Sequence, residues 1–245
     1  MEAVDSVRVL TLVDNDVWQN GLKSEWGLSF YVETRRSEEG FKILMDTGSS
    51  FSTLSENSSS LGTPIEDVDA VFISHWHGDH CGALLDVLAL QKGSTPVYAP
   101  SQNASSTYRM CDVGGVINVC DDPVLIERGV ISTGRVGSGL SEHALLVHVK
   151  NKGLVVLVGC GHPGMMNIVK QAREVSGVEL IYAVLGGFHN ISSKNEIELL
   201  VDFLIDAGAM LVSPCHCTLD ASRRYMEKML GDRFVRNGSG RKITI

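Results

Sequence analysis

The chain has 245 residues, of which 44% are hydrophobic and 20% are charged, and its formal net charge is −8. This length can bury a sizeable core, and the composition is that of a soluble globular protein. The negative charge argues against nucleic acid as the main partner, and no apolar run approaches the roughly 18 to 20 residues of a membrane span. We therefore expect a single domain over residues 1–245 that acts on a small molecule.

The beginning of the chain lacks the features of a secretion signal. Charged residues such as Asp5, Arg8 and Asp14 occupy the region where a signal peptide has an apolar core. The six cysteines are too few and too scattered for a disulfide framework in a chain of this length. We expect a cytoplasmic protein with reduced thiols, and the oligomeric state is left open.

The first half of the chain predicts strands and helices in alternation. Runs of apolar and β-branched residues predict the strands, and apolar residues at helical spacing predict the helices. A DTG motif at 46–48 separates the third strand from the first helix. The expected strands cover residues 7–13, 28–33, 41–45, 71–74 and 97–99, and the expected helices cover residues 50–61, 83–91 and 101–110.

The second half begins with short strands and ends in helix and strand alternation. The segment GRVGSGLS at 134–141 is a candidate lid, with an ordinary surface loop as the alternative. Ser193 and Glu196 match a capping box at the start of a further helix, and Gly208 suits the end of that helix. The remaining strands are expected over 116–120, 124–127, 130–133, 144–149, 154–158, 180–185, 210–213, 234–236 and 242–245, and further helices over 165–175 and 221–230.

The densest polar cluster follows the apolar run at 71–74. His75, His77, Asp79 and His80 fall within six positions of the stretch VFISHWHGDHCGAL. Imidazole nitrogens and carboxylate oxygens are ligands that Zn²⁺ accepts, and crowding them without a metal leaves polar groups poorly satisfied. Gly78 is expected to turn the backbone so that Asp79 and His80 face one point, with a helix starting at 81–83. The cluster predicts a metal site.

This HxHxDH pattern resembles the metallo-β-lactamase superfamily. The resemblance implies a mixed α/β fold, a four-layer αββα sandwich with one or two metals along one edge. It also implies that Asp46 of the DTG motif lies beneath the metal site and supports a ligand, whereas a helix cap or turn is the reading from the local sequence alone.

Three later apolar runs also end in histidine or cysteine, at the places where an α/β fold presents polar groups. They bring Cys160 and His162 in GCGHPG, His189 in GGFHN and His216 in PCHCT. The superfamily closes its site with a histidine on a late strand, which implies His216. Most members carry a bridging aspartate where this chain has Cys160, and a thiolate also binds zinc. The usual intermediate histidine is missing, and we favour His162 over His143 for its place.

The ordered motifs are similar to a narrower branch, the dihydropteroate-synthase-like group. They are DTGSS, SHWHGDHCGAL, SEHALLVH, GCGHPGMMNIV, AVLGGFHN and SPCHCT. Members are often named for a synthase of tetrahydromethanopterin biosynthesis, which joins a dihydropterin methyl diphosphate to a ribofuranosylaminobenzene phosphate and releases diphosphate. HCTL replaces the usual HCTG beside His216, which alters the neighbouring pocket.

We predict a metal-dependent hydrolase that acts on a small phosphate ester or lactone-like substrate through a metal-bound hydroxide. Two divalent ions are expected, with zinc first and iron or manganese as alternatives. Asp79 and His189 are the catalytic candidates, and Arg223 and Lys194 are candidates for binding an anionic group, with solvated helix charges as the alternative. The expected metal ligands are His75, His77, Asp79, His80, Cys160, His162 and His216.

The leading alternative is a transferase that uses a pterin diphosphate in tetrahydromethanopterin-type cofactor synthesis. There the metals would act as Lewis acids on the diphosphate, and a flat aromatic pocket would hold the pterin. Trp76, Phe188 and Tyr108 are the aromatic candidates for it, with packing as the alternative for each. A di-iron redox protein and a metal-binding protein without catalysis are further alternatives.

Overall fold

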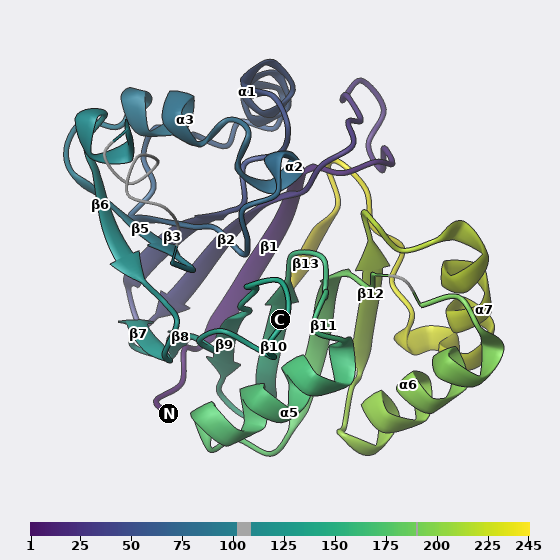
Figure 1. Cartoon of the computed structure of the whole chain (residues 1–245). Helices are drawn as coiled ribbons and strands as arrows, with labels where there is room; N and C mark the ends of the chain where they lie inside the picture. The colour runs from purple at the N-terminus through teal and green to yellow at the C-terminus, as the bar shows by residue number, and fades with distance from the viewer. Residues whose placement is uncertain (102–108, 190) are drawn as a thin grey trace.

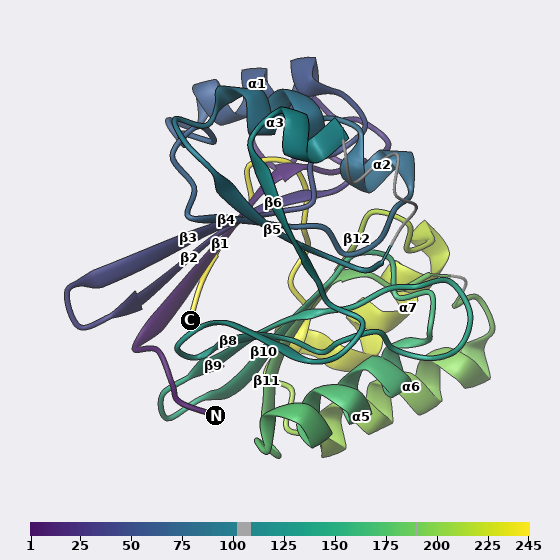
Figure 2. The same cartoon turned by 60° about the vertical axis from the view of Figure 1, so that its left-hand side comes forward.

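The computed structural model contains two packed β-sheets with helices on both outer faces (Figure 1 and Figure 2). It describes residues 1–101, 109–189 and 191–245. The strand order is β13-β1-β2-β3-β4-β5-β6 in the first sheet and β12-β11-β10-β9-β8-β7 in the second. This arrangement confirms the expected αββα sandwich. Within the described residues, no helix combines the length and apolar character needed to cross a membrane.

The strands of each sheet come mostly from one half of the chain. The first sheet contains β1 (Ser6–Val13), β2 (Ser29–Arg36), β3 (Glu39–Met45), β4 (Ala70–Phe72), β5 (Thr95–Ala99), β6 (Gly115–Val119) and β13 (Lys242–Thr244). The second contains β7 (Val124–Glu127), β8 (Val130–Ser132), β9 (Leu145–Val149), β10 (Gly153–Val158), β11 (Ile181–Gly187) and β12 (Leu211–Cys215).

The helices form the outer layers, and their order along the chain follows the sheets they cover. In Figure 2, α1 and α3 lie outside the first sheet, whereas α5, α6 and α7 lie outside the second. The described helices are α1 (Phe51–Ser60), α2 (Gly78–Cys81), α3 (Leu84–Leu90), α5 (Met165–Ser176), α6 (Lys194–Asp206), α7 (Asp220–Leu230) and the 3-10 helix η1 (Gly231–Arg233).

Residue alternation in the strands divides the apolar side chains between cores. In β10, Val155 and Leu157 pack in the core between the sheets, whereas Val156 and Val158 pack in the core beneath the helices of the second sheet. A strand buried on both faces cannot carry polar positions. The uninterrupted run GLVVLV of β10 follows from this double burial.

Parallel pairing brings the carboxyl ends of several strands to the same edge. β3 pairs with β4 in parallel, and β11 pairs in parallel with both β10 and β12. Polar groups that follow such strands therefore meet at one edge. The loops after β3, β4, β10, β11 and β12 carry Asp46, His75, Cys160, His189 and His216 respectively.

Four local expectations have different outcomes. The predicted helix start at 81–83 agrees with α3, which begins at Leu84 with Ala83 as its N-cap, but the one-turn helix α2, which begins at Gly78, is not among the expected elements. Asp79 and His80 do face one point, yet Gly78 has no positive φ and open space where a Cβ would lie, so the turn does not require glycine there. The close approach falls on Gly82, where a Cβ would lie 2.2 Å from the carbonyl oxygen of Ser49. The strand over 234–236 is wrong, since that segment forms an isolated bridge. The helix over 101–110 falls mainly outside the described residues.

The capping box at the start of α6 is confirmed. The Ser193 side chain accepts a hydrogen bond from the Glu196 backbone N–H, and the Glu196 carboxylate accepts one from the Ser193 N–H. Gly208, beyond the end of this helix, has a φ of 95°. Only glycine adopts such a conformation without strain, so the local sequence sets both ends of this helix.

His143 is completely buried just before β9 and serves the fold. Its Nε2 lies 2.8 Å from the Ile73 carbonyl oxygen, its Nδ1 lies 2.7 Å from Ser132 Oγ, and its ring stacks on Phe72 at 4.1 Å between centroids. Burial lowers the pKa of His143 from 6.5 to about 4. Its neutral ring therefore holds two sheets together.

We expect His143 to make folding stability depend on pH. Between pH 6.5 and pH 4 the unfolded chain binds a proton here that the folded chain excludes. The stabilisation is therefore complete above the unfolded pKa and is lost as the pH falls, by roughly 2 kcal/mol at pH 5. Urea unfolding should show a smaller loss between pH 7 and pH 5 in His143→Gln than in the wild type or in the control His148→Gln. Equal losses in all three proteins would contradict this.

Candidate metal centre

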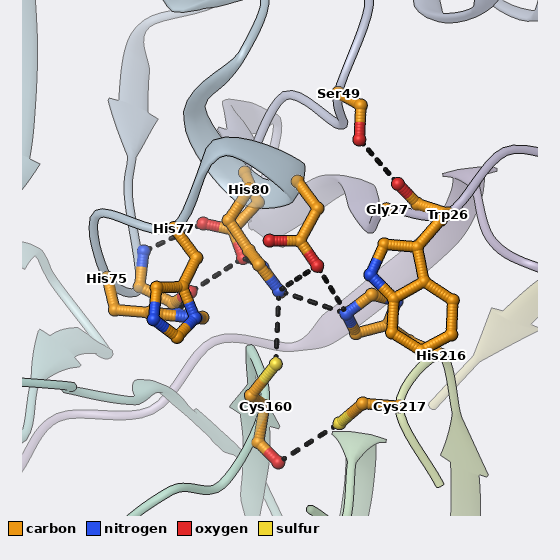
Figure 3. Close-up of polar contacts among 12 residues, drawn as sticks. Trp26, Gly27, Ser49, His75, His77, His80, Cys160, His216 and Cys217 are labelled. Carbon is orange, nitrogen blue, oxygen red and sulfur yellow. Dashed lines mark hydrogen bonds and ion pairs between the residues drawn. The ribbon is translucent and has the colours of Figure 1, made fainter. Parts of the chain in front are cut away.

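The polar side chains at the strand ends point toward one another between the two sheets. Figure 3 shows His75, His77 and His80 facing Cys160 and His216, which come from the other sheet. Several groups of three have ligand atoms that all lie within 4.8 Å of one another. They are His75–His77–His162, Asp79–His80–His216, His75–His80–Cys160, Cys160–His162–His189 and Cys160–His216–Cys217.

The group Asp79–His80–His216 brings two nitrogen lone pairs face to face. Asp46 Oδ2 lies 2.7 Å from His80 Nδ1, and Asn15 Oδ1 lies 3.1 Å from His216 Nδ1. Each ring donates its Nδ1 proton to an oxygen, so both Nε2 atoms carry lone pairs, and these atoms are 3.1 Å apart. Asp79 Oδ2 lies 3.4 Å from His216 Nε2. Burial opposes a charge on His80, but the Asp46 carboxylate raises its pKa. Either a proton or a metal cation between the two rings therefore relieves the repulsion.

The group His75–His77–His162 repeats this logic. Ser74 Oγ donates to Asp46 Oδ2 at 2.7 Å, so it accepts from His75 Nδ1 at 3.0 Å. The lone pair of His75 Nε2 therefore faces His77 Nδ1 at 3.1 Å. The rings of His75 and His77 each lie 4.9 Å from that of His162. Asp46 thus orients a histidine in each group, a contact in keeping with its expected supporting place.

Cys160 lies where the two groups meet. Its Sγ is 3.2 Å from His80 Nε2, and it belongs to three of the five groups of possible ligands found among the described residues. The Cys217 thiol and burial raise the pKa of the Cys160 thiol well above its ordinary value, so without a metal it holds its proton; divalent cations bind the deprotonated form. Cys217, to which the sequence analysis assigns no role, lies beside it, with Sγ 3.5 Å from the Cys160 carbonyl oxygen.

Two buried imidazole nitrogens lack any hydrogen-bond partner within the described part of the chain. They are His162 Nε2 and His189 Nδ1, and their rings lie 4.3 Å apart. Burial and the neighbouring His189 lower the pKa of His162 to about 4, and burial with His77 lowers the pKa of His189. Both rings are therefore neutral, the form that coordinates a metal. These orphaned nitrogens, together with the facing lone pairs, fit a divalent cation.

A buried carboxylate that sequence reasoning does not single out holds the Cys160 loop. Glu142 Oε1 accepts hydrogen bonds from the N–H groups of Cys160 at 2.9 Å and Gly161 at 2.8 Å, and Oε2 accepts from His162 at 2.8 Å. Glu142 is fully buried. The only sequence signal is an acid in the apolar surroundings of SEHALLV. This contact aims Cys160 and His162 at the site.

The end of β1 supports His216 in the same way. The buried Asp14 Oδ1 accepts from the His216 N–H at 2.9 Å, and Asn15 Nδ2 donates to the His216 carbonyl oxygen at 2.9 Å. His216 has a φ of 50°, which is costly for a residue other than glycine. The same strand-end search, applied to the run before Asp14, would have found both residues.

The two cationic candidates lie outside these groups. The Arg223 guanidinium pairs with Asp16 and Asp220 and lines a cavity of about 640 Å³ that contains none of the grouped ligand residues. Lys194 Nζ lies 5.7 Å from the centroid of the Tyr225 ring. Their role in substrate binding stays a prediction.

We expect Cys160→Ser to reduce the metal content. Serine removes the soft thiolate from the point where the groups meet, so the bound zinc should fall from about two ions per chain toward one. Elemental analysis of purified protein measures the ratio. The control Cys120→Ser changes a buried cysteine that belongs to none of the groups of possible ligands that the described residues form, and whose Sγ donates to the Asn118 carbonyl oxygen. An unchanged ratio in Cys160→Ser would show that the thiol only packs.

We expect Glu142→Gln to weaken metal binding through the loop that Glu142 holds. The amide –NH₂ cannot accept a backbone hydrogen bond, so at least one N–H of residues 160–162 loses its partner. Losses of such supporting contacts weaken metal affinity roughly 10- to 100-fold. Zinc competition with a chromophoric chelator measures this affinity. The control is Glu227→Gln, which changes a half-buried carboxylate on α7 that pairs with Arg236 and lies outside the groups of possible ligands among the described residues. Equal affinities in the two variants would exclude a positioning role.

The comparisons with known proteins agree with this geometry. Residues 27–106 match the model of the metallo-beta-lactamase superfamily. The 7,8-dihydropterin-6-methyl-4-(beta-D-ribofuranosyl)-aminobenzene-5'-phosphate synthase of Methanocaldococcus jannaschii is 26% identical, and the alignment covers 98% of this chain and 97% of that protein.

Solved structures show the same fold over nearly the whole chain. The crystal structure of Tm1679, a metal-dependent hydrolase of the beta-lactamase superfamily, is 25% identical with a TM-score of 0.76, and the match covers 97% of this chain and 98% of that one. A diphosphatase from the PhnP family is 13% identical with a TM-score of 0.62, covering 99% and 98%, a likeness of fold alone. Residues 27–106 thus match the metallo-beta-lactamase superfamily, and the two-sheet architecture of the chain is the fold of the similar hydrolase Tm1679.

Proposed function

We propose that this protein is a metal-dependent hydrolase that acts on a small phosphate ester or a lactone-like substrate. The observation that carries the proposal is the pair of groups His75–His77–His162 and Asp79–His80–His216, with Cys160 beside both. The likeness to Tm1679, which is described as a metal-dependent hydrolase, supports the reaction class. A net charge of −8 favours a small molecule over nucleic acid as the substrate.

The donor set favours zinc, with iron or manganese as alternatives. Imidazole and thiolate are ligands that zinc accepts readily. Asp79 adds a carboxylate oxygen, which iron and manganese also accept. Divalent cations held in such a pair supply Lewis acidity toward phosphoryl or carbonyl oxygens and lower the pKa of water to roughly 7. We propose two such ions, one for each group of three residues.

Asp79 is placed to orient a water molecule and the substrate. Its side chain is 19% exposed, whereas those of His80 and His216 have no exposed surface. Burial would raise the pKa of Asp79, but the neighbouring imidazoles of His216 and His80 outweigh this effect when they carry positive charge, and the pKa of Asp79 lies below its ordinary value. The carboxylate is therefore charged at neutral pH and can accept a hydrogen bond from water.

In this proposal His189 exchanges a proton with the leaving group. Its backbone N–H donates to the Cys160 carbonyl oxygen at 2.9 Å, which fixes the backbone beside the site. Its Nδ1 has no partner within the described residues, and the ring is only partly buried. A neutral imidazole with one free nitrogen is equipped for general acid–base chemistry near neutral pH.

A transferase is the second candidate, and one observation favours it. The methanopterin-related synthase aligns with nearly the whole of this chain. In such a reaction the same groups would bind the diphosphate that leaves, and an amine or carbon nucleophile would replace water. The two proposals share the site and differ in the nucleophile.

Substrate turnover in isotopically labelled water separates the two. We expect the zinc-loaded protein to cleave an aryl phosphodiester or a lactone and to place labelled oxygen in the product, detected by mass spectrometry. Asp79→Asn should lower kcat by roughly 100-fold or more, because it removes both a metal ligand and the group that orients water. Turnover of a dihydropterin methyl diphosphate only when an arylamine acceptor is present, without cleavage by water, would overturn the hydrolase proposal.

A further inference from the structure

We propose that Trp26 is a stacking surface for a planar aromatic ring of the substrate at the entrance of the candidate metal centre. This inference rests on the proposed function, because it assigns a substrate class to the same site. The substrate class is a phosphate ester or lactone whose reacting group lies within a few bonds of a flat aromatic or heteroaromatic ring.

The indole of Trp26 is exposed beside a candidate metal ligand. Its residue exposure is 63%, and its ring centroid lies 5.4 Å from that of His216 with an angle of 54° between the rings. Figure 3 shows the indole alongside His216 at the margin of the residues drawn. An exposed large apolar side chain beside a polar site is a common mark of ligand binding.

The backbone around Trp26 is fixed although the ring is free. The Ser49 hydroxyl donates to the Trp26 carbonyl oxygen, and the Gly27 N–H donates to Asn15 Oδ1 at 3.2 Å. The next N–H, that of Leu28, donates to the Asp79 carbonyl oxygen at 3.1 Å. The indole is thus carried by a segment attached to both Asp79 and the Asn15 that orients His216.

The backbone at Gly27 lies so close to the backbones of Asp79 and Ser49 that only glycine fits beside the tryptophan. A Cβ on Gly27 would lie 2.9 Å from the Asp79 carbonyl oxygen and 3.0 Å from the Ser49 nitrogen. The preceding residue also contributes, because Glu25 Oε1 accepts from the N–H groups of Ser49 at 2.8 Å and Ser50 at 2.9 Å. Because the backbone that carries the indole is already fixed, only the side-chain torsions of Trp26 remain to be ordered on binding.

The other aromatic candidates do not offer such a surface. Trp76 donates its Nε1–H to the Pro100 carbonyl oxygen at 2.9 Å and packs against the core of the first sheet. Phe188 is 2% exposed within the core of the second sheet, and Tyr108 lies outside the described residues. Trp18 is exposed, but the Arg241 guanidinium covers its ring at 4.1 Å. Trp26 is the ring that both borders the ligand groups and stays uncovered by the described residues.

A pair of phosphonates tests the inference by binding rather than by turnover. Calorimetry with zinc-loaded protein gives the affinity of phenylphosphonate and of methylphosphonate, which share the anion and differ in the ring. We expect the wild type to prefer the phenyl compound by roughly tenfold. Trp26→Leu should reduce this ratio to roughly two, whereas Trp26→Phe should retain most of it and the control Trp18→Leu should leave it unchanged.

The outcomes distinguish this inference from the proposed function. A phenyl preference that is absent in the wild type, or that persists in Trp26→Leu, overturns the role of Trp26 even if the protein hydrolyses esters. A preference that depends on Trp26, in a protein that cleaves no ester or lactone with water, supports the aromatic site and overturns the hydrolase. Failure of both phosphonates to bind overturns both. Circular dichroism of each variant checks that it has folded, and Trp26→Phe provides the test should Trp26→Leu not fold.

Discussion

The repulsion between facing lone pairs is the constraint on which the site depends. His80 and His216 bring their Nε2 atoms to 3.1 Å, and the lone pair of His75 Nε2 lies at the same distance from His77 Nδ1. Neutral rings such as His80 and His216, which donate their Nδ1 protons to oxygens, cannot relieve the repulsion between themselves. The folded chain holds them together because both sheets and their loops are packed around the site, and a cation turns the repulsion into attraction.

Residues behind the ligands supply the rigidity that this arrangement needs. Asp46 orients His80 directly and His75 through Ser74, while Glu142 fixes the loop that carries Cys160. Each of these carboxylates is itself buried, and a buried charge is tolerated only where hydrogen bonds surround it. The supporting contacts therefore explain why buried carboxylates occur at the edge of the sheets where the ligand residues meet.

The exposed or unpartnered groups of the site are relevant to the choice between water and another nucleophile. Asp79 and His189 keep a free polar atom or exposed surface, whereas Trp26 offers a flat apolar face next to His216. A hydrolase and a transferase can both use an aromatic surface of this kind. The Trp26 surface favours substrates that carry an aromatic ring, and it does not distinguish water from another nucleophile. The experiment in labelled water makes that distinction.

The sequence by itself determined the metal-ligand cluster and the fold class. His75, His77, Asp79 and His80 fall within six positions, so their proximity is nearly local, and the resemblance carried by their HxHxDH pattern implied the αββα sandwich. The one-turn helix α2 escaped prediction because a single turn has no periodicity to detect. Only the tertiary structure decided the partners: the contacts of Glu142 with Cys160 and of Asn15 with His216 span 18 and 201 positions. Such contacts arise from the packing of two sheets, which no local pattern encodes.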